Sequence, residues 1–131
     1  MSTVPALHAA LAADAELVAI VEGRVFEHVP ARAPHPYVVI GAEASRPWST
    51  DREPGREWVV AVHVWFRTAR RHDVHRALER VRAATAFERL GPHLPGLVNV
   101  VPGTGRTERL PERGLVHGEL RLRIRTEEDT P

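Results

Sequence analysis

The stretch GELRLRIR, residues 118–125, decides the fold. Its three aliphatic residues alternate with three arginines, Arg121, Arg123 and Arg125. Successive side chains of a β-strand point to opposite faces, so this pattern predicts a strand with one apolar face and one row of guanidinium groups. The apolar face needs helices to cover it, and the arginine row needs carboxylates, phosphates or a neighbouring subunit. The stretch therefore predicts a sheet with different partners on its two sides.

A second run, Glu57–Thr68, is the longest predicted strand. Its even-numbered residues form a face suited to a core: Trp58, Val60, Val62, Val64 and Phe66. The opposite face is half apolar and carries His63 and Trp65. We expect a subunit, or the polar segment before the strand, to cover part of this second face.

The remaining pattern completes an α+β fold. Helical spacing of apolar residues predicts helices over 5–21 and 73–90. Asp14 interrupts the first of these: it either faces solvent or caps a second short helix over 15–21. Strands are expected at 37–42, 57–68, 97–101, 106–110 and 115–126. We predict one domain over residues 1–131, a mostly antiparallel β-sheet with two helices packed on one face.

Residues 43–56 are polar and rich in turn-forming types, which predicts a long loop. Trp48 lies in the middle of this segment. A tryptophan on an exposed loop is a candidate interface anchor, although it could also fold back onto its own domain.

Composition excludes several classes of site. The 131 residues contain no cysteine, which rules out disulfides, thiolate metal sites and cysteine nucleophiles. All 18 basic residues are arginine, and the net charge is only +1, which is not typical of a nucleic-acid-binding protein. No stretch approaches the ~20 apolar residues of a membrane-spanning helix, so we expect no membrane partner.

Enzyme motifs are weak. His72 and His75 are three residues apart at a predicted helix start, but a zinc site needs a third ligand, and the His-Glu-x-x-His spacing is absent. His63 could act as a general base only beside a carboxylate, and no nucleophile motif accompanies it. We therefore predict no catalytic residues, no cofactor and no metal site.

Four segments in order carry a resemblance: ALHAALAADAELVAIVEGRVFEHVP (6–30), PHPYVVIGAEASRPWST (34–50), EWVVAVHVWFR (57–67) and HGELRLRIRTEE (117–128). Together they resemble the small tail-terminator, or tail-completion, proteins of long-tailed phages, in the version found in prophages and gene transfer agents. The resemblance extends from about residue 5 to residue 127.

The resemblance implies a structural virion protein rather than an enzyme. Such proteins are made in the bacterial cytoplasm and form a ring, expected to have six subunits, at the head-proximal end of the tail tube. The ring ends tube polymerisation, meets the head-completion or connector protein, and lets DNA pass through its lumen without sequence-specific binding. On this hypothesis Trp48, His63, Trp65, Arg121, Arg123 and Arg125 are the candidate interface residues.

Three alternatives stay open. The chain could be another head–tail joining or minor tail protein. It could bind nucleic acid through the arginine row, in which case binding should depend steeply on salt. It could also be a metal enzyme that uses His72 and His75.

Overall fold

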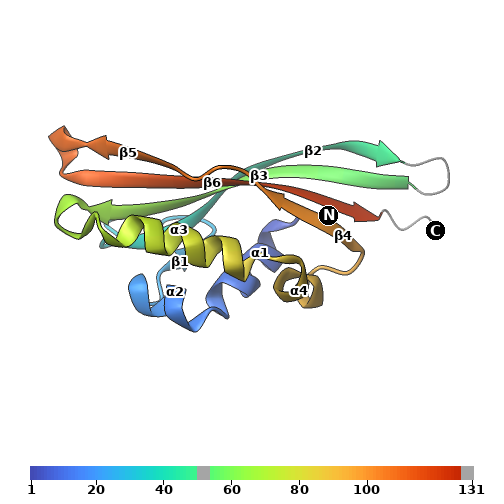
Figure 1. Ribbon diagram of the computed structural model, residues 1–131, viewed down its shortest axis with the longest axis horizontal. Coiled ribbons are helices and arrows are strands. Elements are labelled where there is room, and N and C mark those ends of the chain that lie inside the picture. The colour runs from blue at the N-terminus through green and yellow to red at the C-terminus, as the bar shows by residue number, and fades with distance from the viewer. Residues whose placement is uncertain (50–53, 128–131) are drawn as a thin grey trace.

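The computed structural model describes residues 1–49 and 54–127. Within these ranges, six strands form one sheet and four α-helices lie together on one side of it (Figure 1). The elements in chain order are α1 (Val4–Ala12), α2 (Ala15–Ile20), β1 (Val25–Phe26), β2 (Tyr37–Ser49), β3 (Pro54–Arg67), α3 (Asp73–Ala84), α4 (Phe87–Leu90), β4 (Leu97–Pro102), β5 (Arg106–Leu110) and β6 (Leu115–Glu127).

The sheet has the strand order β1-β2-β3-β6-β4, and β5 also pairs with β6. Only the short β1 pairs in parallel; all the other pairings are antiparallel. The central pair, β3 and β6, stays in continuous register from Gly55 opposite Glu127 to Arg67 opposite Leu115. The predicted α+β class, the mostly antiparallel sheet and the terminal hairpin of β5 and β6 are confirmed.

The core lies between the sheet and the helices. The apolar even-numbered residues predicted for 57–68 are all buried, as are Leu120, Leu122 and Ile124 of β6. Helix α3 adds a buried stripe made of Val74, Ala77, Leu78, Val81 and Ala84. Each large aliphatic or aromatic side chain removed from water in this way contributes about 1.5–3 kcal/mol. The alternation in the sequence thus fixed which face of each central strand meets the helices.

Helix α3 packs closely on β6 because Gly118 has no side chain. A Cβ at this position would lie 2.7 Å from Val64 Cγ2 and 2.9 Å from Val74 Cγ1. The first contact comes from the neighbouring strand β3 and the second from the helix itself. Glycine here sets the distance between the helix layer and the sheet.

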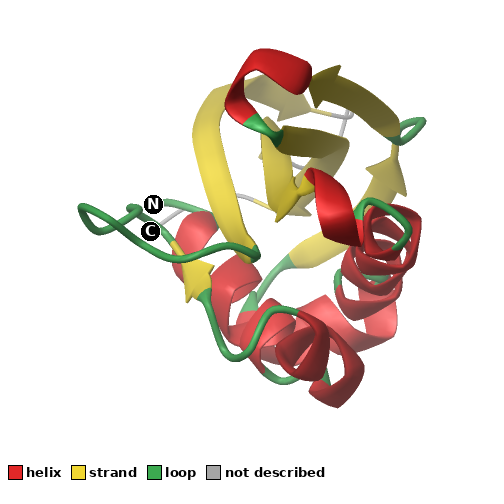
Figure 2. Ribbon diagram, turned by 90° about the vertical axis from the view of Figure 1, so that its left-hand side faces the viewer, coloured by secondary structure: helices red, strands yellow, loops and turns green. Residues whose placement is uncertain are grey.

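All the described helices lie on one face of the sheet, as expected, and each of the two predicted helical segments is divided into two helices (Figures 1 and 2). Asp14 ends the first predicted helix and accepts a hydrogen bond from the Leu17 N–H at 2.8 Å, so it caps α2. The second predicted helix stops at Thr85, whose hydroxyl donates to the Val81 carbonyl, and Ala86 is extended. The Asp14 cap and the extended backbone of Ala86 mark the two points of division.

The predicted loop over 43–56 is wrong for its described part. β2 continues to Ser49 and β3 begins at Pro54, so this segment is the far end of a long hairpin (Figure 1); residues 50–53 lie outside the described part. Pro47 is tolerated because β2 is an edge strand here, as β1 pairs only with Val38 and Val39. Polar composition therefore indicated solvent exposure rather than a loop.

Among the described helices, none is long and apolar enough to cross a membrane.

Candidate functional site on the open face of the sheet

The sheet face opposite the helices, here called the open face, carries the odd-numbered side chains of β3 and β6 and their neighbours on β2. Figures 1 and 2 show the helices gathered on the other side. The strand registers place all the candidate interface residues on this face: Trp48, His63, Trp65, Arg121, Arg123 and Arg125. They form two groups along the strands, one around Glu57 and one around His63. These groups lie about 20 Å apart, at roughly 3.3 Å per residue.

The first group surrounds a carboxylate that sequence reasoning did not single out. Glu57 accepts hydrogen bonds from Arg125 Nε at 3.0 Å and from Arg46 Nη2 at 2.8 Å, and Arg123 Nε lies 3.8 Å away. The hydrogen bond from Arg125 lowers the pKa of Glu57, and the Arg46 hydrogen bond adds to the effect against the opposing cost of burial. Three guanidinium groups around one carboxylate leave this part of the face positively charged.

Trp48 belongs to the same group. Its ring lies beneath the Arg125 guanidinium, with Cζ 4.8 Å from the ring centroid, which is a cation–π contact. A Cβ on Gly55, directly opposite, would lie 2.6 Å from Trp48 Cε3, so only glycine leaves room for the ring. Trp48 is half-buried on a strand, and the expectation of a tryptophan on an exposed loop is therefore wrong.

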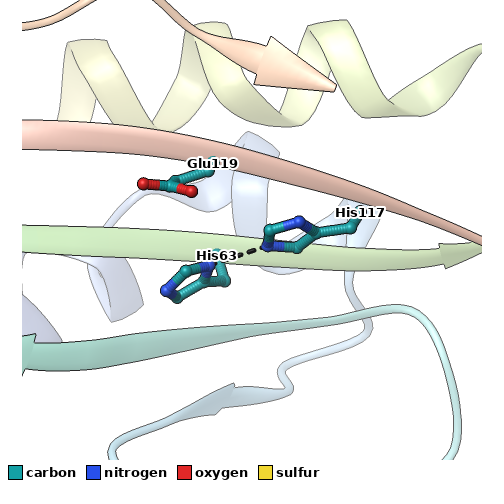
Figure 3. Close-up of side chains that lie close together, drawn as sticks. All are labelled: His63, His117 and Glu119. Atoms are coloured by element: carbon teal, nitrogen blue, oxygen red, sulfur yellow. Dashed lines mark hydrogen bonds between the residues drawn. The ribbon is translucent and has the colours of Figure 1, made fainter. Parts of the chain in front are cut away.

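The second group centres on two histidines (Figure 3). His63 Nδ1 and His117 Nε2 are 2.7 Å apart and share a hydrogen bond, and the Trp65 ring lies 4.4 Å from the His117 ring. Burial, and then the neighbouring His63, lower the pKa of His117 and favour its neutral form. Glu119 lies directly across the strand pair from His63. Its hydrogen bond from Arg121, at 2.9 Å, lowers its own pKa.

Between these groups the open face exposes aliphatic side chains. Val59 of β3 is 38% exposed and Val101 of β4 is 51% exposed, and both lie directly opposite Arg123 of β6. Exposed valines interleaved with arginine are a composition suited to contact with another protein surface.

The arginine row is mostly paired within the chain. Arg121 hydrogen-bonds Glu119 of the same strand, whereas Arg123 and Arg125 face Glu57. Sequence reasoning did not identify three residues of this face, because their roles depend on the register of β3, β4 and β6: Glu57, His117 and Val101. The available signal was that His117 shares the odd-numbered face of β6 with the arginine row, but a strand pattern does not give the register between strands.

The histidine pair at the start of α3 does not form a comparable cluster. His72 and His75 are exposed, and His72 Nε2 lies 3.7 Å from the carboxylate of Asp73, its neighbour in the chain. Among residues 1–49 and 54–127, the one group of three side chains placed to share a metal ion is His63, His117 and Glu119.

Comparison with known proteins agrees with the resemblance seen in the sequence. The family model described as "Tail completion protein gp17" matches residues 5–127. Among solved structures, a chain of the "Virion of native gene transfer agent (GTA) particle" is similar at a TM-score of 0.65 and 23% identity, with 95% of this chain and 93% of that chain covered. At this identity the likeness establishes the fold. No curated protein sequence matches the chain.

The match over residues 5–127 confirms the resemblance and gives the chain a structural role in a phage-type tail. The chain belongs to the tail completion protein gp17 family.

Proposed function

We propose that this chain forms a ring at the head-proximal end of a tail tube, ends tube polymerisation there and joins the tail to the head connector. The observation that carries the proposal is the family match over residues 5–127. The solved gene transfer agent virion, which contains a chain of the same fold, supports it. On this proposal residues 1–131 act as one domain, with six copies in the ring and DNA passing through its lumen.

The open face supplies surfaces suited to such an assembly. In a closed ring, one patch of each subunit meets a different patch of the next, and closure limits growth. The exposed Val59 and Val101 offer apolar area for contact with a neighbouring subunit. We infer that the open face, with Trp48, His63, Trp65 and the arginine row, contacts the neighbouring subunit or the tail tube.

The nucleic-acid alternative gains no support from the arginine row. Arg125 and Arg46 are committed to Glu57, and Arg121 is committed to Glu119. Phosphates would have to compete with these carboxylates for the same guanidinium groups. A non-catalytic role in particle assembly fits this arrangement better.

A reconstituted system tests the proposal. Purified tail tube protein should polymerise to unbounded lengths alone and to shorter, capped tubes when this chain is added, and imaging should locate the chain at one tube end. Native mass spectrometry should record an assembly of six copies, either free or on the tube. Tubes that grow equally long with and without the chain would contradict the capping role.

A further inference from the structure

The proposed ring contacts include His63 but give no role to its pairing with His117 and Glu119 on the open face. Each of these residues offers one ligand atom, and the three atoms all lie within 4.8 Å of one another (Figure 3). We propose that the three side chains bind a divalent first-row transition metal of the zinc class, with water completing its coordination. The proposal does not depend on the ring.

The donor set matches what zinc prefers. Zinc takes imidazole nitrogens at about 2.0–2.1 Å and carboxylate oxygens at about 2.0–2.2 Å, with four ligands arranged as a tetrahedron. Ligand atoms in that arrangement lie about 3.3 Å apart. His63 Nδ1 and His117 Nε2 are already 2.7 Å apart, so a small separation of the two rings admits the ion.

The hydrogen bond between the two rings also shows that one free lone pair already points between them. A hydrogen bond between two imidazole nitrogens needs one of them to be an unprotonated acceptor, and that lone pair is the one a metal takes. The other nitrogen of the pair offers its lone pair once its proton moves to the second nitrogen of the same ring, so two neutral imidazoles can hold the ion without a net loss of protons.

The rings are held in place by their neighbours. Trp65 lies against the His117 ring, and the two histidine rings stack at 5.0 Å with 22° between their planes. On the far side of His63, a Cβ added to Gly41 would lie 2.9 Å from Nε2, so that nitrogen faces backbone while Nδ1 faces His117. This packing presents Nδ1 of His63, rather than Nε2, to the shared site.

The competitor for the third ligand is Arg121, whose Nε donates to Glu119 Oε1 at 2.9 Å. The Arg121 side chain is 72% exposed, so it can swing into solvent and leave the carboxylate to the metal. This competition predicts opposite effects of two substitutions on zinc affinity, which nonspecific binding of zinc to histidines would not produce. Arg121→Ala should tighten metal binding, and Glu119→Gln should weaken it.

The test is a zinc titration of the full, untagged chain, followed by isothermal calorimetry in a buffer that does not bind metal. We expect one zinc per chain, a zinc-dependent rise in melting temperature, and affinity weakened by roughly tenfold or more in His63→Gln and in His117→Gln. Melting curves without metal show whether each variant is folded. The matched control is His72→Gln with His75→Gln, which removes the exposed pair at the start of α3.

The control should bind zinc as the native chain does. Absence of zinc binding by the native chain would overturn the proposal. So would binding that survives in His63→Gln with His117→Gln, or binding that is lost in the His72 and His75 control.

Discussion

At the scale of single residues, Asp14 connects three helices. It caps α2 through the Leu17 N–H and accepts hydrogen bonds from Arg80 of α3 at 2.6 Å and from Arg89 at 2.9 Å. Its side chain is only 1% exposed. Burial works against its ionisation, but the hydrogen bonds from Arg80, Leu17 and Arg89 outweigh that cost and lower the pKa of Asp14.

Asp14→Asn should lower the free energy of unfolding at neutral pH by about 1–3 kcal/mol, because it keeps a cap but loses two charged hydrogen bonds. The direction in which the stabilising contribution of Asp14 changes with pH follows from its lowered pKa. The contribution of Asp14 is complete above the unfolded aspartate pKa of about 3.9 and disappears as the pH falls through the lower folded value. Urea unfolding of both proteins across this range should show the difference shrinking with acid.

Glu16→Gln is the matched control. Glu16 is 59% exposed and lies 3.6 Å from Arg80, so its loss should change stability little. An Asp14→Asn deficit that stayed constant as the pH fell to strongly acid values would contradict the role given to ionised Asp14.

At the scale of elements, the close packing of α3 on β6 depends on Gly118. Gly118→Ala should destabilise the fold by about 1–3 kcal/mol, because the new methyl group meets Val64 and Val74 at less than 3 Å in a packed core. Chemical denaturation measures the loss. Gly91→Ala, where nothing lies within 4 Å of the added Cβ, is the control and should be neutral or better. Equal stability of the two variants would mean that the layer spacing does not depend on Gly118.

Sequence reasoning succeeded for elements whose apolar residues follow the spacing of a strand or a helix. The alternation at 118–125 and 57–68 predicted both central strands and their buried faces, and the helical spacing of apolar residues over 73–90 predicted the helix that α3 forms. It failed over 43–56, because a hairpin that extends past the helices has little core to face and so looks like a loop. The His63–His117–Glu119 cluster was out of reach, because it depends on the register between β3 and β6.

At the scale of the whole molecule, the far end of the β2–β3 hairpin is where the proposed contacts can be disturbed with least harm to the fold. Trp48→Ala removes a half-buried ring and one cation–π contact, a loss of about 1 kcal/mol, so the chain should fold. Joined particles should nevertheless become scarcer in a producer strain that carries this variant, as counted by electron microscopy.

Phe87→Ala is the control for Trp48→Ala. Phe87 is a 49% exposed aromatic side chain on α4, on the helix side of the sheet, and its removal should leave particle joining unchanged. Normal particle numbers from Trp48→Ala would remove Trp48 from the proposed interface.

The most direct test of the whole account is negative-stain imaging of particles from a producer strain that lacks this gene. A chain that caps the tail tube and joins it to the head predicts free heads beside unattached tails of uncontrolled length, with normal particles restored by the native gene. Intact particles with tails of normal length, produced without the gene, would contradict that claim.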